Sequence, residues 1–361
     1  MEKKRRFLNT PAGTKPFFLE ESLFRTEIVK LLSNYFTRWG FIPITPPIID
    51  YYDIYENLLS EELSKGSIRF IDRNGDIVLL RNDIALFCAK IIASRLSSNN
   101  SILRYFYSDT IIRGEHNNLP EEYYQIGCEL VAEKFSYQEI ELITILMESK
   151  KELGIKDCVL HIGDISFYDK ILKGIDENSY LEILETIRNR NKSSLKKIIN
   201  SLKLDENIKK DCIIASNFIG TFDQLFNLPL SNIGKKALSN LENIGTIITK
   251  IYNSDEIIFD LSEPPKLKYY DGIIFKLYSK ESGSIIASGG RYDLVYKKLG
   301  INKKSVGFSY YLQQLEKILN IDNFIKEENV EKIKTDEKNK EMTFIKAIND
   351  IKSGKNIEII Y

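Results

Sequence analysis

The sequence predicts an α+β fold in which a mostly antiparallel sheet is flanked by helices and interrupted by a helical insertion. Three observations predict it. Segments with alternating side chains occur in neighbouring pairs joined by short polar turns, which is typical of antiparallel strands. Amphipathic helical segments separate these pairs. Between residues 166 and 252 helical periodicity dominates, and strand-like segments resume after it.

The first hundred residues combine helices with short strands. Residues 20–38 place apolar side chains at helical spacing and end at Trp39-Gly40. Residues 41–50 predict a strand at an edge or a bulge, because their prolines cannot donate to a sheet. Residues 67–80 predict a hairpin around Asn74-Gly75, a strong two-residue turn signal. A helix is expected over residues 83–95.

Two antiparallel strands are then expected over residues 102–114 and 121–132, joined by the polar loop EHNNLPEE. The second strand has two distinct faces, formed by Ile126, Cys128 and Leu130 and by Gln125, Gly127 and Glu129. The run is too apolar and aromatic for a solvent-facing edge, so both faces are expected to be buried. A buried carboxylate persists only when something pairs with it. Glu129 therefore requires a partner.

The rest of the chain divides into parts of different character. A helix over residues 136–153 and a strand over 158–164 precede the helical insertion. The strands that return after it are followed by the glycine pair of GGRYD, a helix, and a last strand and helix over 305–319. Residues 321–341 are rich in lysine and glutamate and predict a solvated linker, with one helix and one strand after it. We expect three parts: a core of residues 1–165 and 253–320, the insertion 166–252, and a linker and tail 321–361.

Composition excludes several classes of function. The chain of 361 residues has 51 basic and 51 acidic side chains, so no net positive field attracts nucleic acid. The four cysteines form no CxxC pair and have only His116 and His161 as metal-binding companions, so we expect reduced, mostly buried thiols and no metal. No apolar run is long enough to cross a bilayer. We expect a soluble, cytoplasmic protein that binds no membrane.

The strand 121–132 has the form of a ligand-binding floor. Gln125 and Glu129 stand two strand steps on either side of the midpoint Gly127, and glycine inside a strand often marks the close approach of a ligand or another backbone. An isolated Q-x-G-x-E pattern is more commonly a structural hydrogen-bond network or an ion pair between strands. The pattern therefore needs support from other parts of the sequence.

Support comes from an ordered set of short motifs along the chain. They are PAGT (11–14), LRND (80–83), IIRGE (111–115), YYQIGCE (123–129), LKYYDG (267–272), GGRYD (289–293) and SVGF (305–308). Together they resemble the catalytic core of the histidyl-tRNA synthetases, a family of class II aminoacyl-tRNA synthetases. The resemblance covers about residues 10–320 and includes the position of the helical insertion. It implies a class II synthetase-like core.

The resemblance implies a histidine-binding site. Glu129 corresponds to the residue that pairs with the imidazole of bound histidine, and Gln125 and Asp83 to residues that face its α-amino group. Tyr269 and Tyr270 correspond to the tyrosines that line the imidazole pocket, and a carboxylate with aromatic walls suits a flat ring that carries N–H donors. For Asp83 the alternative is an acid at a helix N-terminus, and for the tyrosines it is ordinary strand packing.

The sequence departs from the family where the synthetases bind ATP. Arg113 matches the arginine that meets the α-phosphate and the amino-acid carboxylate. Glu121 and Glu122 stand where the synthetases place arginines, and negative charge there repels triphosphate. Gln313 and Gln314 replace a Glu-Arg pair whose arginine binds the γ-phosphate.

Two further replacements affect catalysis and binding. Pro265 stands at the position of a catalytic arginine, and Ala85 replaces a threonine that helps to hold histidine. After residue 320 about forty residues remain, which we judge too few for an anticodon-binding domain. With zero net charge, binding of tRNA also lacks electrostatic support.

One branch of the family is similar in these losses: the regulatory subunits of ATP phosphoribosyltransferase. The resemblance implies a non-catalytic protein without a cofactor that binds a short-form catalytic subunit and makes the first step of histidine biosynthesis sensitive to L-histidine. It also implies a homodimer within a hetero-oligomer, with residues 20–38 and the strand that ends at Pro47 at the homodimer contact. The alternative for this helix is packing within its own domain.

Two other functions stay open from the sequence. A divergent histidyl-tRNA synthetase or another amino-acid adenylating enzyme requires phosphate-binding arginines from unexpected places, such as Arg104 or Arg291. Arg291 also has a structural explanation as a turn and helix-start residue. The third possibility is a histidine-binding relative that regulates a different protein, such as a kinase or a translation factor.

Overall fold

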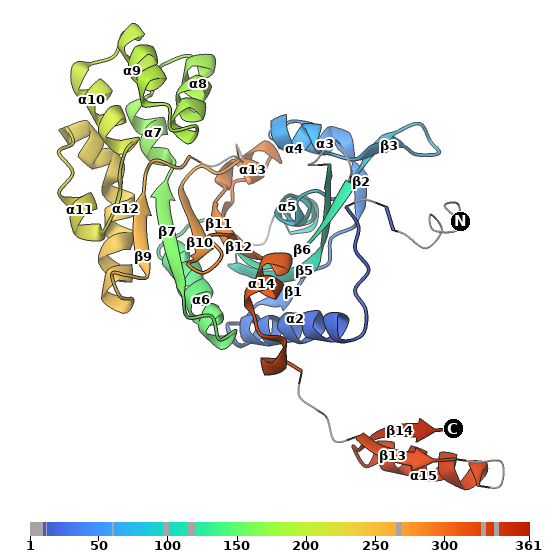
Figure 1. The fold of residues 1–361 in the computed structure, drawn as a ribbon. Helices are drawn as coiled ribbons and strands as arrows, with labels where there is room; N and C mark the ends of the chain where they lie inside the picture. The colour runs from blue at the N-terminus through green and yellow to red at the C-terminus, as the bar shows by residue number, and fades with distance from the viewer. Residues whose placement is uncertain are drawn as a thin grey trace, which may run out of the picture.

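A nine-stranded sheet forms the centre of the chain in the computed structural model (Figure 1). The structure describes residues 10–11, 13–59, 61–96, 101–114, 120–264, 269–325, 330–335 and 339–361. In spatial order the strands are β1 (Ile42–Pro43), β5 (Leu103–Gly114), β6 (Pro120–Ala132), β12 (Lys304–Tyr311), β11 (Ile285–Arg291), β10 (Ile273–Ser279), β7 (Cys158–Asp164), β9 (Ile257–Asp260) and β8 (Ile219–Gly220). Among the described strands of this sheet, the β1–β5 and β7–β9 pairs are parallel and the other neighbouring pairs are antiparallel. The predicted mostly antiparallel sheet is confirmed.

The N-terminal region forms the predicted long helix and a second, smaller sheet. Helix α2 spans Glu20–Arg38, and the edge strand β1 follows it. The hairpin of β3 (Arg69–Ile71) and β4 (Ile77–Leu80) pairs with β2 (Ile49–Tyr51) to form a three-stranded sheet. Gly75 at the hairpin turn has φ of 94°, a conformation that glycine adopts without steric cost. Short helices α3 (Tyr52–Glu56) and α4 (Glu61–Lys65) connect β2 to the hairpin.

Both faces of the central sheet are covered, as the alternation in β6 predicted. Helices α2 and α6 (Gln138–Glu152) pack on one face, where Ile126, Cys128 and Leu130 join the larger core. Helices α5 (Ile84–Arg95) and α13 (Asp293–Lys298) lie on the other face with the small sheet (Figure 1). The predicted ligand-binding side chains of β6, Gln125 and Glu129, point to this second face.

The segment between β7 and β9 is almost entirely helical. It contains α7 (Ser166–Ile171), α8 (Glu177–Arg188), α9 (Lys192–Ser201), α10 (Glu206–Ala215), α11 (Phe222–Phe226) and α12 (Asn232–Ile251). These helices gather at the end of the sheet away from the N-terminus (Figure 1). The sequence predicted no strand here, but Ile219 and Gly220 form β8. They extend the sheet because their backbone pairs with Asp260 and Phe259 of β9.

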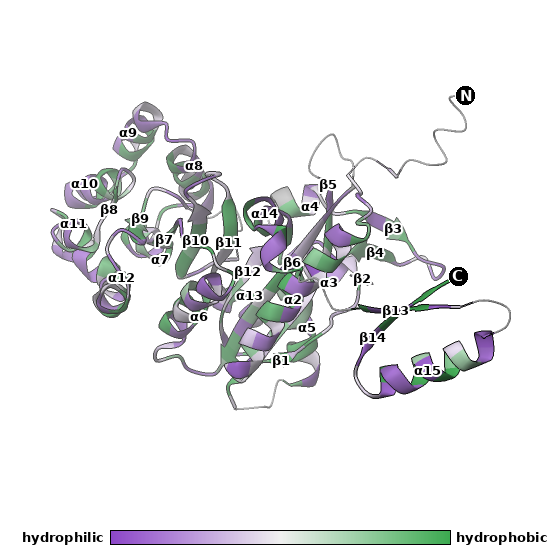
Figure 2. Ribbon diagram, turned by 60° about the horizontal axis from the view of Figure 1, so that its bottom comes forward, coloured by the Kyte–Doolittle hydropathy of each residue, from purple (hydrophilic) through white to green (hydrophobic). Residues whose placement is uncertain are grey.

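The C-terminal region contains a strand where a linker was expected. After α14 (Leu312–Ile318) and a 3-10 turn (Ile321–Asn323), the strand β13 (Val330–Lys334) pairs in parallel with β14 (Asn356–Ile360), and α15 (Lys340–Lys352) connects them. The strand was not predicted because its composition is rich in lysine and glutamate. It forms because its charges are paired across strands: Lys332 Nζ lies 3.4 Å from Glu358 Oε2 of β14. Figures 1 and 2 show this unit apart from the central sheet.

The remaining expectations concern cysteines and membranes. All four cysteines are buried and unpaired, as predicted. Burial raises the pKa of the Cys88 and Cys128 thiols well above the ordinary value, so these groups stay protonated. No helix in the described ranges is both long enough and apolar enough to cross a membrane.

Gly127 is required by the backbone of the neighbouring strand. A Cβ atom at this position would lie 2.2 Å from the carbonyl oxygen of Phe308 and 2.8 Å from Cα of Ser309. Both atoms belong to β12, whose Ser309 is the cross-strand partner of Gly127. The glycine therefore marks the close approach of another backbone, one of the two explanations that the sequence allowed.

We expect Gly127→Ala to lower the free energy of unfolding by about 3 kcal/mol, because the added methyl group forces β6 and β12 apart. Denaturant unfolding followed by circular dichroism measures the change. The matched control is Gly283→Ala, where a Cβ meets no atom within 4 Å but φ is 65°. This control should lose only about 1 kcal/mol. Equal losses in the two variants would contradict the explanation.

Candidate functional site

A cavity opens on the α5 face of the central sheet and contains all six predicted ligand-binding residues. Its volume, including the open mouth, is about 460 Å³. The predicted residues that line it are Asp83, Arg113, Gln125, Glu129, Tyr269 and Tyr270. Further lining residues are Ala85, Tyr107, Ser288, Tyr292, Gly307, Phe308, Ser309 and Tyr311. Residues far apart in the sequence therefore meet at one site.

The register of three adjacent strands brings these residues together. On β6, Gln125 and Glu129 lie on either side of Gly127 and face the cavity. Tyr107 of β5 is the cross-strand partner of Gly127, and Gly307 of β12 is the partner of Glu129. Since directly opposed residues of an antiparallel pair share a face, one row of side chains forms the cavity floor.

Two tyrosine hydroxyl groups hold the Glu129 carboxyl. Tyr292 donates to Oε2 at 2.5 Å, and Tyr107 donates to Oε1 at 3.2 Å. Glu129 is only 2% exposed. Burial raises its pKa to about 8, the negative charge of Asp83 adds to the rise, and the two tyrosine hydrogen bonds oppose it. Glu129 is therefore mainly a neutral acid at pH 7.

Tyr107 and Tyr292 are site residues that were not predicted from the sequence. Tyr292 lies in the GGRYD motif, where only the arginine received attention. Tyr107 could have been identified because it lies an even number of residues before Arg113 on the same strand, which places both side chains on the cavity face. Their contacts with Glu129 depend on pairing between strands, which alternation within one strand does not give.

Gly307 leaves the space that the Glu129 side chain occupies. A Cβ on Gly307 would lie 1.4 Å from Glu129 Oε2 and 2.0 Å from its carboxyl carbon. Any larger residue in the SVGF motif would displace the carboxyl group from the cavity floor. The glycine in this motif and the glutamate in YYQIGCE are thus one structural feature.

Asp83 caps helix α5, the structural alternative considered from the sequence, and also lines the cavity. Its Oδ1 accepts a hydrogen bond from the backbone N–H of Leu86 at 3.1 Å, which caps the N-terminus of α5. Its Oδ2 accepts from the Tyr269 hydroxyl at 2.8 Å and lies 4.0 Å from Arg113 Nη2. The ring of Tyr270 lies 4.9 Å from that of Tyr269 between centroids. The cap therefore orients a carboxylate beside a guanidinium.

Asp83 is the last of three consecutive residues whose side chains connect different segments. Arg81 is 1% exposed and donates to the carbonyl oxygens of Pro46 at 2.7 Å and Thr110 at 2.8 Å. Asn82 donates from Nδ2 to Ser67 Oγ at 2.6 Å, and its carbonyl accepts from Arg113 Nε at 2.8 Å. The segment fixes the backbone before α5 and places the Arg113 guanidinium.

The glutamines that replace the synthetase Glu-Arg pair have structural contacts. Gln313 accepts from the backbone N–H of Tyr124 at 3.1 Å and donates to the Glu122 carbonyl at 3.0 Å, so it ties the start of α14 to β6. Gln314 accepts from Lys317 at 3.3 Å. Glu121 is the cross-strand partner of Arg113. Gln313, Gln314 and Glu121 thus place neutral or acidic side chains where the synthetases have arginines or a Glu-Arg pair.

Some sequence-based expectations fall outside the described residues. These are Pro265 at the position of the catalytic arginine, His116 and the rest of the loop 115–119, Lys268 of LKYYDG and Ala12 of PAGT. Ala85 is described and lines the cavity in the first turn of α5.

The two arginines considered as replacement phosphate ligands lie on the opposite side of the sheet from the cavity. Arg104 forms an ion pair with Glu141 of α6. Arg291 forms ion pairs with Glu139 of α6, at 2.7 Å, and with Asp293, at 2.9 Å. Both guanidinium groups are thus directed toward carboxylates of the helix that covers the other face. This geometry agrees with the structural explanation of Arg291.

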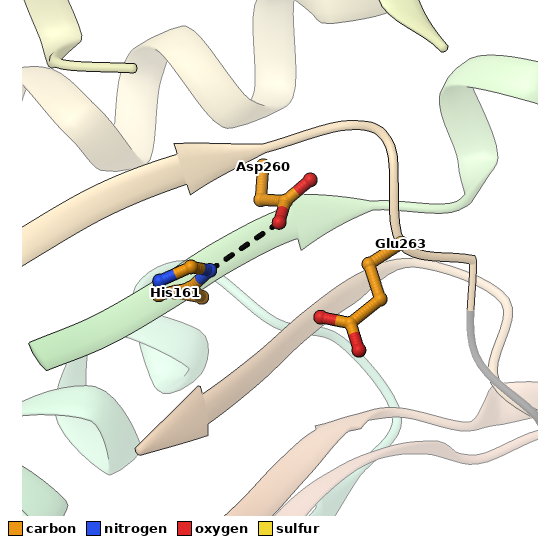
Figure 3. Close-up of side chains that lie close together, drawn as sticks. All are labelled: His161, Asp260 and Glu263. Carbon is orange, nitrogen blue, oxygen red and sulfur yellow. Dashed lines mark hydrogen bonds and ion pairs between the residues drawn. The ribbon is translucent and has the colours of Figure 1, made fainter. Parts of the chain in front are cut away.

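A second polar cluster lies near the ends of β7 and β9 (Figure 3). His161 Nδ1 lies 3.3 Å from Asp260 Oδ2, and Glu263 lies close to both. Lys276 Nζ lies 2.6 Å from Glu263 Oε1, so a lysine already supplies positive charge to the cluster. Burial alone would raise the pKa of Asp260, but hydrogen bonds from His161 and Ser262 lower it. The contacts connect β9 to β7 and β10.

A family model described as Histidyl-tRNA synthetase matches residues 14–315. An ATP phosphoribosyltransferase regulatory subunit from Alkaliphilus metalliredigens is 28% identical over 331 residues, which cover 88% of this chain and 83% of that protein. A protein of the same name from Clostridium novyi is 27% identical over 339 residues, which cover 90% of this chain and 77% of that protein.

Solved structures share the fold. A Bacillus halodurans structure titled as an ATP phosphoribosyltransferase regulatory subunit/histidyl-tRNA synthetase has a TM-score of 0.83 at 21% identity, and the match covers 97% of this chain and 92% of that one. Histidyl-tRNA synthetase from Nostoc has a TM-score of 0.76 at 19% identity and covers 98% and 86%. At these identities the likeness shows the fold alone.

The raised pKa of Glu129 predicts a pH-dependent stability. Folded protein keeps the proton up to about pH 8, whereas an unfolded chain releases it near pH 4.5. The contribution of this group is therefore fully present below pH 4.5 and is lost as the pH rises through 8. We expect wild type to lose on the order of 3 kcal/mol more than Glu129→Gln between pH 5 and pH 9.

Denaturant unfolding at a series of pH values measures this difference. The control Glu141→Gln makes the same chemical change on the opposite face of the sheet, and it should keep the wild-type slope because it retains Glu129. Parallel pH profiles for wild type and Glu129→Gln would show that Glu129 is not a buried neutral acid.

Proposed function

The chain belongs to the histidyl-tRNA synthetase family, and from this we propose that it is a non-catalytic regulatory subunit of ATP phosphoribosyltransferase. In this proposal it associates with the catalytic subunit in the cytoplasm, supports the first step of histidine biosynthesis and makes that step sensitive to histidine. The relatives from Alkaliphilus metalliredigens and Clostridium novyi carry the regulatory-subunit name, which supports the assignment.

The observation that carries the proposal is the buried carboxyl of Glu129 at the floor of a cavity that is also lined by an Asp–Arg pair. Free histidine is a zwitterion with an imidazole at its far end. The Asp83 carboxylate suits its ammonium group, and the Arg113 guanidinium 4.0 Å away suits its carboxylate. Gln125 adds a polar contact near the ammonium group, and Tyr269 and Tyr270 supply aromatic walls.

The protonated state of Glu129 suits a neutral imidazole. At pH 7 the ligand ring is mostly unprotonated, whereas Glu129 holds a proton because burial raises its pKa to about 8. One proton is then shared between the carboxyl oxygen and the imidazole nitrogen, so binding needs no proton from solvent. A glutamine at this position has no acidic proton to share.

Adenylation requires cationic groups around a triphosphate. The contacts at the corresponding positions of this chain support the proposal that these cationic groups have been lost. Gln313 and Gln314 occupy the positions of the Glu-Arg pair, and Glu121 stands opposite Arg113. Arg104 and Arg291 are engaged by α6 on the other face. We therefore propose that aminoacylation is absent and that tRNA is not a partner.

Histidine would act through linkage between two binding equilibria. A ligand that prefers one arrangement of the complex shifts the population toward it, and the catalytic subunit responds to this shift. We also propose a homodimer within the hetero-oligomer. Helix α2 buries Ile28 and Leu32 in its own core, as the alternative required, but leaves Leu23 and the neighbouring Ile42 of β1 exposed for a second subunit.

The three-part division made from the sequence is part of this proposal. The core would comprise residues 1–165 and 253–320, and the helical insertion residues 166–252. The C-terminal part would begin at residue 321, now with the strand β13 in place of an extended linker.

We expect Glu129→Gln to weaken histidine binding about 100-fold, because the buried site loses its proton-sharing carboxyl group. Isothermal titration calorimetry with L-histidine measures the affinity. Glu141→Gln is the matched control and should bind as wild type. Association with the catalytic subunit should be unchanged in both variants. Unchanged histidine affinity in Glu129→Gln would mean that Glu129 is only structural.

The regulatory role is tested by co-expression with a short-form ATP phosphoribosyltransferase catalytic subunit. We expect a stable complex whose activity exceeds that of the catalytic subunit alone and falls when histidine is added. The complex with Glu129→Gln should be active but insensitive to histidine at concentrations that inhibit wild type. Failure to form a complex would refute the proposed role, and so would an activity that histidine does not change. Exchange of pyrophosphate into ATP with histidine would instead favour a synthetase.

A further inference from the structure

Helix α15 in the C-terminal unit leaves most of its large apolar residues exposed, on the flank next to its buried face. Thr343 and Ala347 are buried against β13 and β14. On one flank of the helix, about a third of a turn from this buried face, lie Phe344, Ile345, Ile348 and Ile351, with exposed fractions of 44, 53, 51 and 60%; Met342, 76% exposed, lies on the opposite flank. We call Phe344, Ile345, Ile348 and Ile351 the outer stripe. A surface helix normally places polar residues there.

Charged residues of α15 instead contact the helix's own sheet and its following turn. Lys346 Nζ lies 2.9 Å from Glu331 Oε1 of β13. Asp350 Oδ1 lies 3.2 Å from Lys355, which also pairs with Glu331 at 3.0 Å. Partly exposed ion pairs therefore flank the buried face of α15 on one side, and aliphatic side chains that face solvent flank it on the other.

The unit has too small a core to account for this arrangement by itself. In residues 330–335 and 339–361, the buried side chains are Ile333, Thr343 and Ala347. A two-stranded parallel sheet with one helix normally needs further cover, because parallel sheets are stable when both faces are packed. The outer stripe thus has the composition of an interface between subunits.

The charges at the two ends of the stripe identify its occupant. At 100° per residue, Glu341 and Lys352 lie on the same side of α15 as the stripe, one at each end. In Figure 2 the middle of α15 is hydrophobic and its ends are hydrophilic. When two copies of such a helix pair in antiparallel orientation, Ile345 faces Ile348 of the partner and each Glu341 faces a Lys352.

We propose that the outer stripe of α15 binds the same stripe of a second copy of this chain, with the two helices antiparallel about a two-fold axis. An isologous contact of this kind uses the same surface of both copies. It forms when the helix surface is complementary to itself in the antiparallel orientation, as the outer stripe and its two end charges are. Four aliphatic or aromatic side chains from each copy leave water, and two Glu341–Lys352 pairs flank them. The contact is separate from the homodimer surface proposed at α2 and β1.

Charge reversal tests the proposal in the full-length protein. Glu341→Lys gives a chain with lysine at both ends of the stripe, and Lys352→Glu gives a chain with glutamate at both ends. Each variant alone would meet like charges in the antiparallel pair and should associate through α15 about ten-fold more weakly than wild type. An equimolar mixture has fully complementary ends and should recover the wild-type association.

Two measurements are specific to the α15 contact. Hydrogen exchange followed by mass spectrometry should show lower amide protection of α15 in each single variant and recovered protection in the mixture. Tagged Lys352→Glu should capture untagged Glu341→Lys more strongly than it captures untagged Lys352→Glu. Ile348→Asp should remove the protection in every background, while Met342→Asp, at an exposed position outside the stripe, should change it little.

The mixture separates pairing from effects within one chain. Both single variants also place an unfavourable charge near a helix terminus, but mixing two proteins does not alter that effect. The proposal is overturned if the mixture shows the average protection of its two components, or if the single variants protect α15 as wild type does. Loss of protection with Ile348→Asp but no recovery on mixing would indicate that α15 docks on its own chain, which also overturns it.

Discussion

The candidate site depends on one buried group, the Glu129 carboxyl on the central strand β6. Desolvation of a carboxylate is so costly that the surroundings must either neutralise it or provide donors. This protein does both: burial favours the protonated form, and the hydroxyls of Tyr107 and Tyr292 hold the two oxygens. Gly307 then has to lack a side chain, because the carboxyl occupies that space. The requirements of one residue fix the identity of its neighbours on two adjacent strands.

Much of this arrangement was predictable from the sequence, and the reason is periodicity. Alternation in YYQIGCELV placed Gln125 and Glu129 on one face and Cys128 on the other, and the structure has them so. The limits of α2 and α5 followed from helical spacing and from the capping residue Asp83. Each of these features is determined by residues close together in the sequence.

The rest depended on contacts that local pattern does not contain. The Tyr292 hydroxyl reaches Glu129 across 163 residues of sequence, because β12 pairs with β6 on one side and with β11, which ends just before Tyr292, on the other. The strand β13 was missed because lysine and glutamate are rare in strands, yet the charge of Lys332 is balanced by Glu358 of β14. Both omissions concern partners supplied by a distant strand.

The segment Arg81–Asp83 connects the cavity to the backbone that leads into the three-stranded sheet. Asp83 belongs to the cavity wall, Asn82 holds the Arg113 side chain through its carbonyl, and Arg81 fixes the Pro46 carbonyl just before the small sheet. Because the three residues are consecutive and each is held by hydrogen bonds, a shift of one moves the others. A molecule that pulls on the Asp83 carboxylate therefore strains, within about 10 Å of chain, the anchor of the three-stranded sheet. The Asp83 side of the cavity is therefore coupled, through two neighbouring residues, to the backbone before β2.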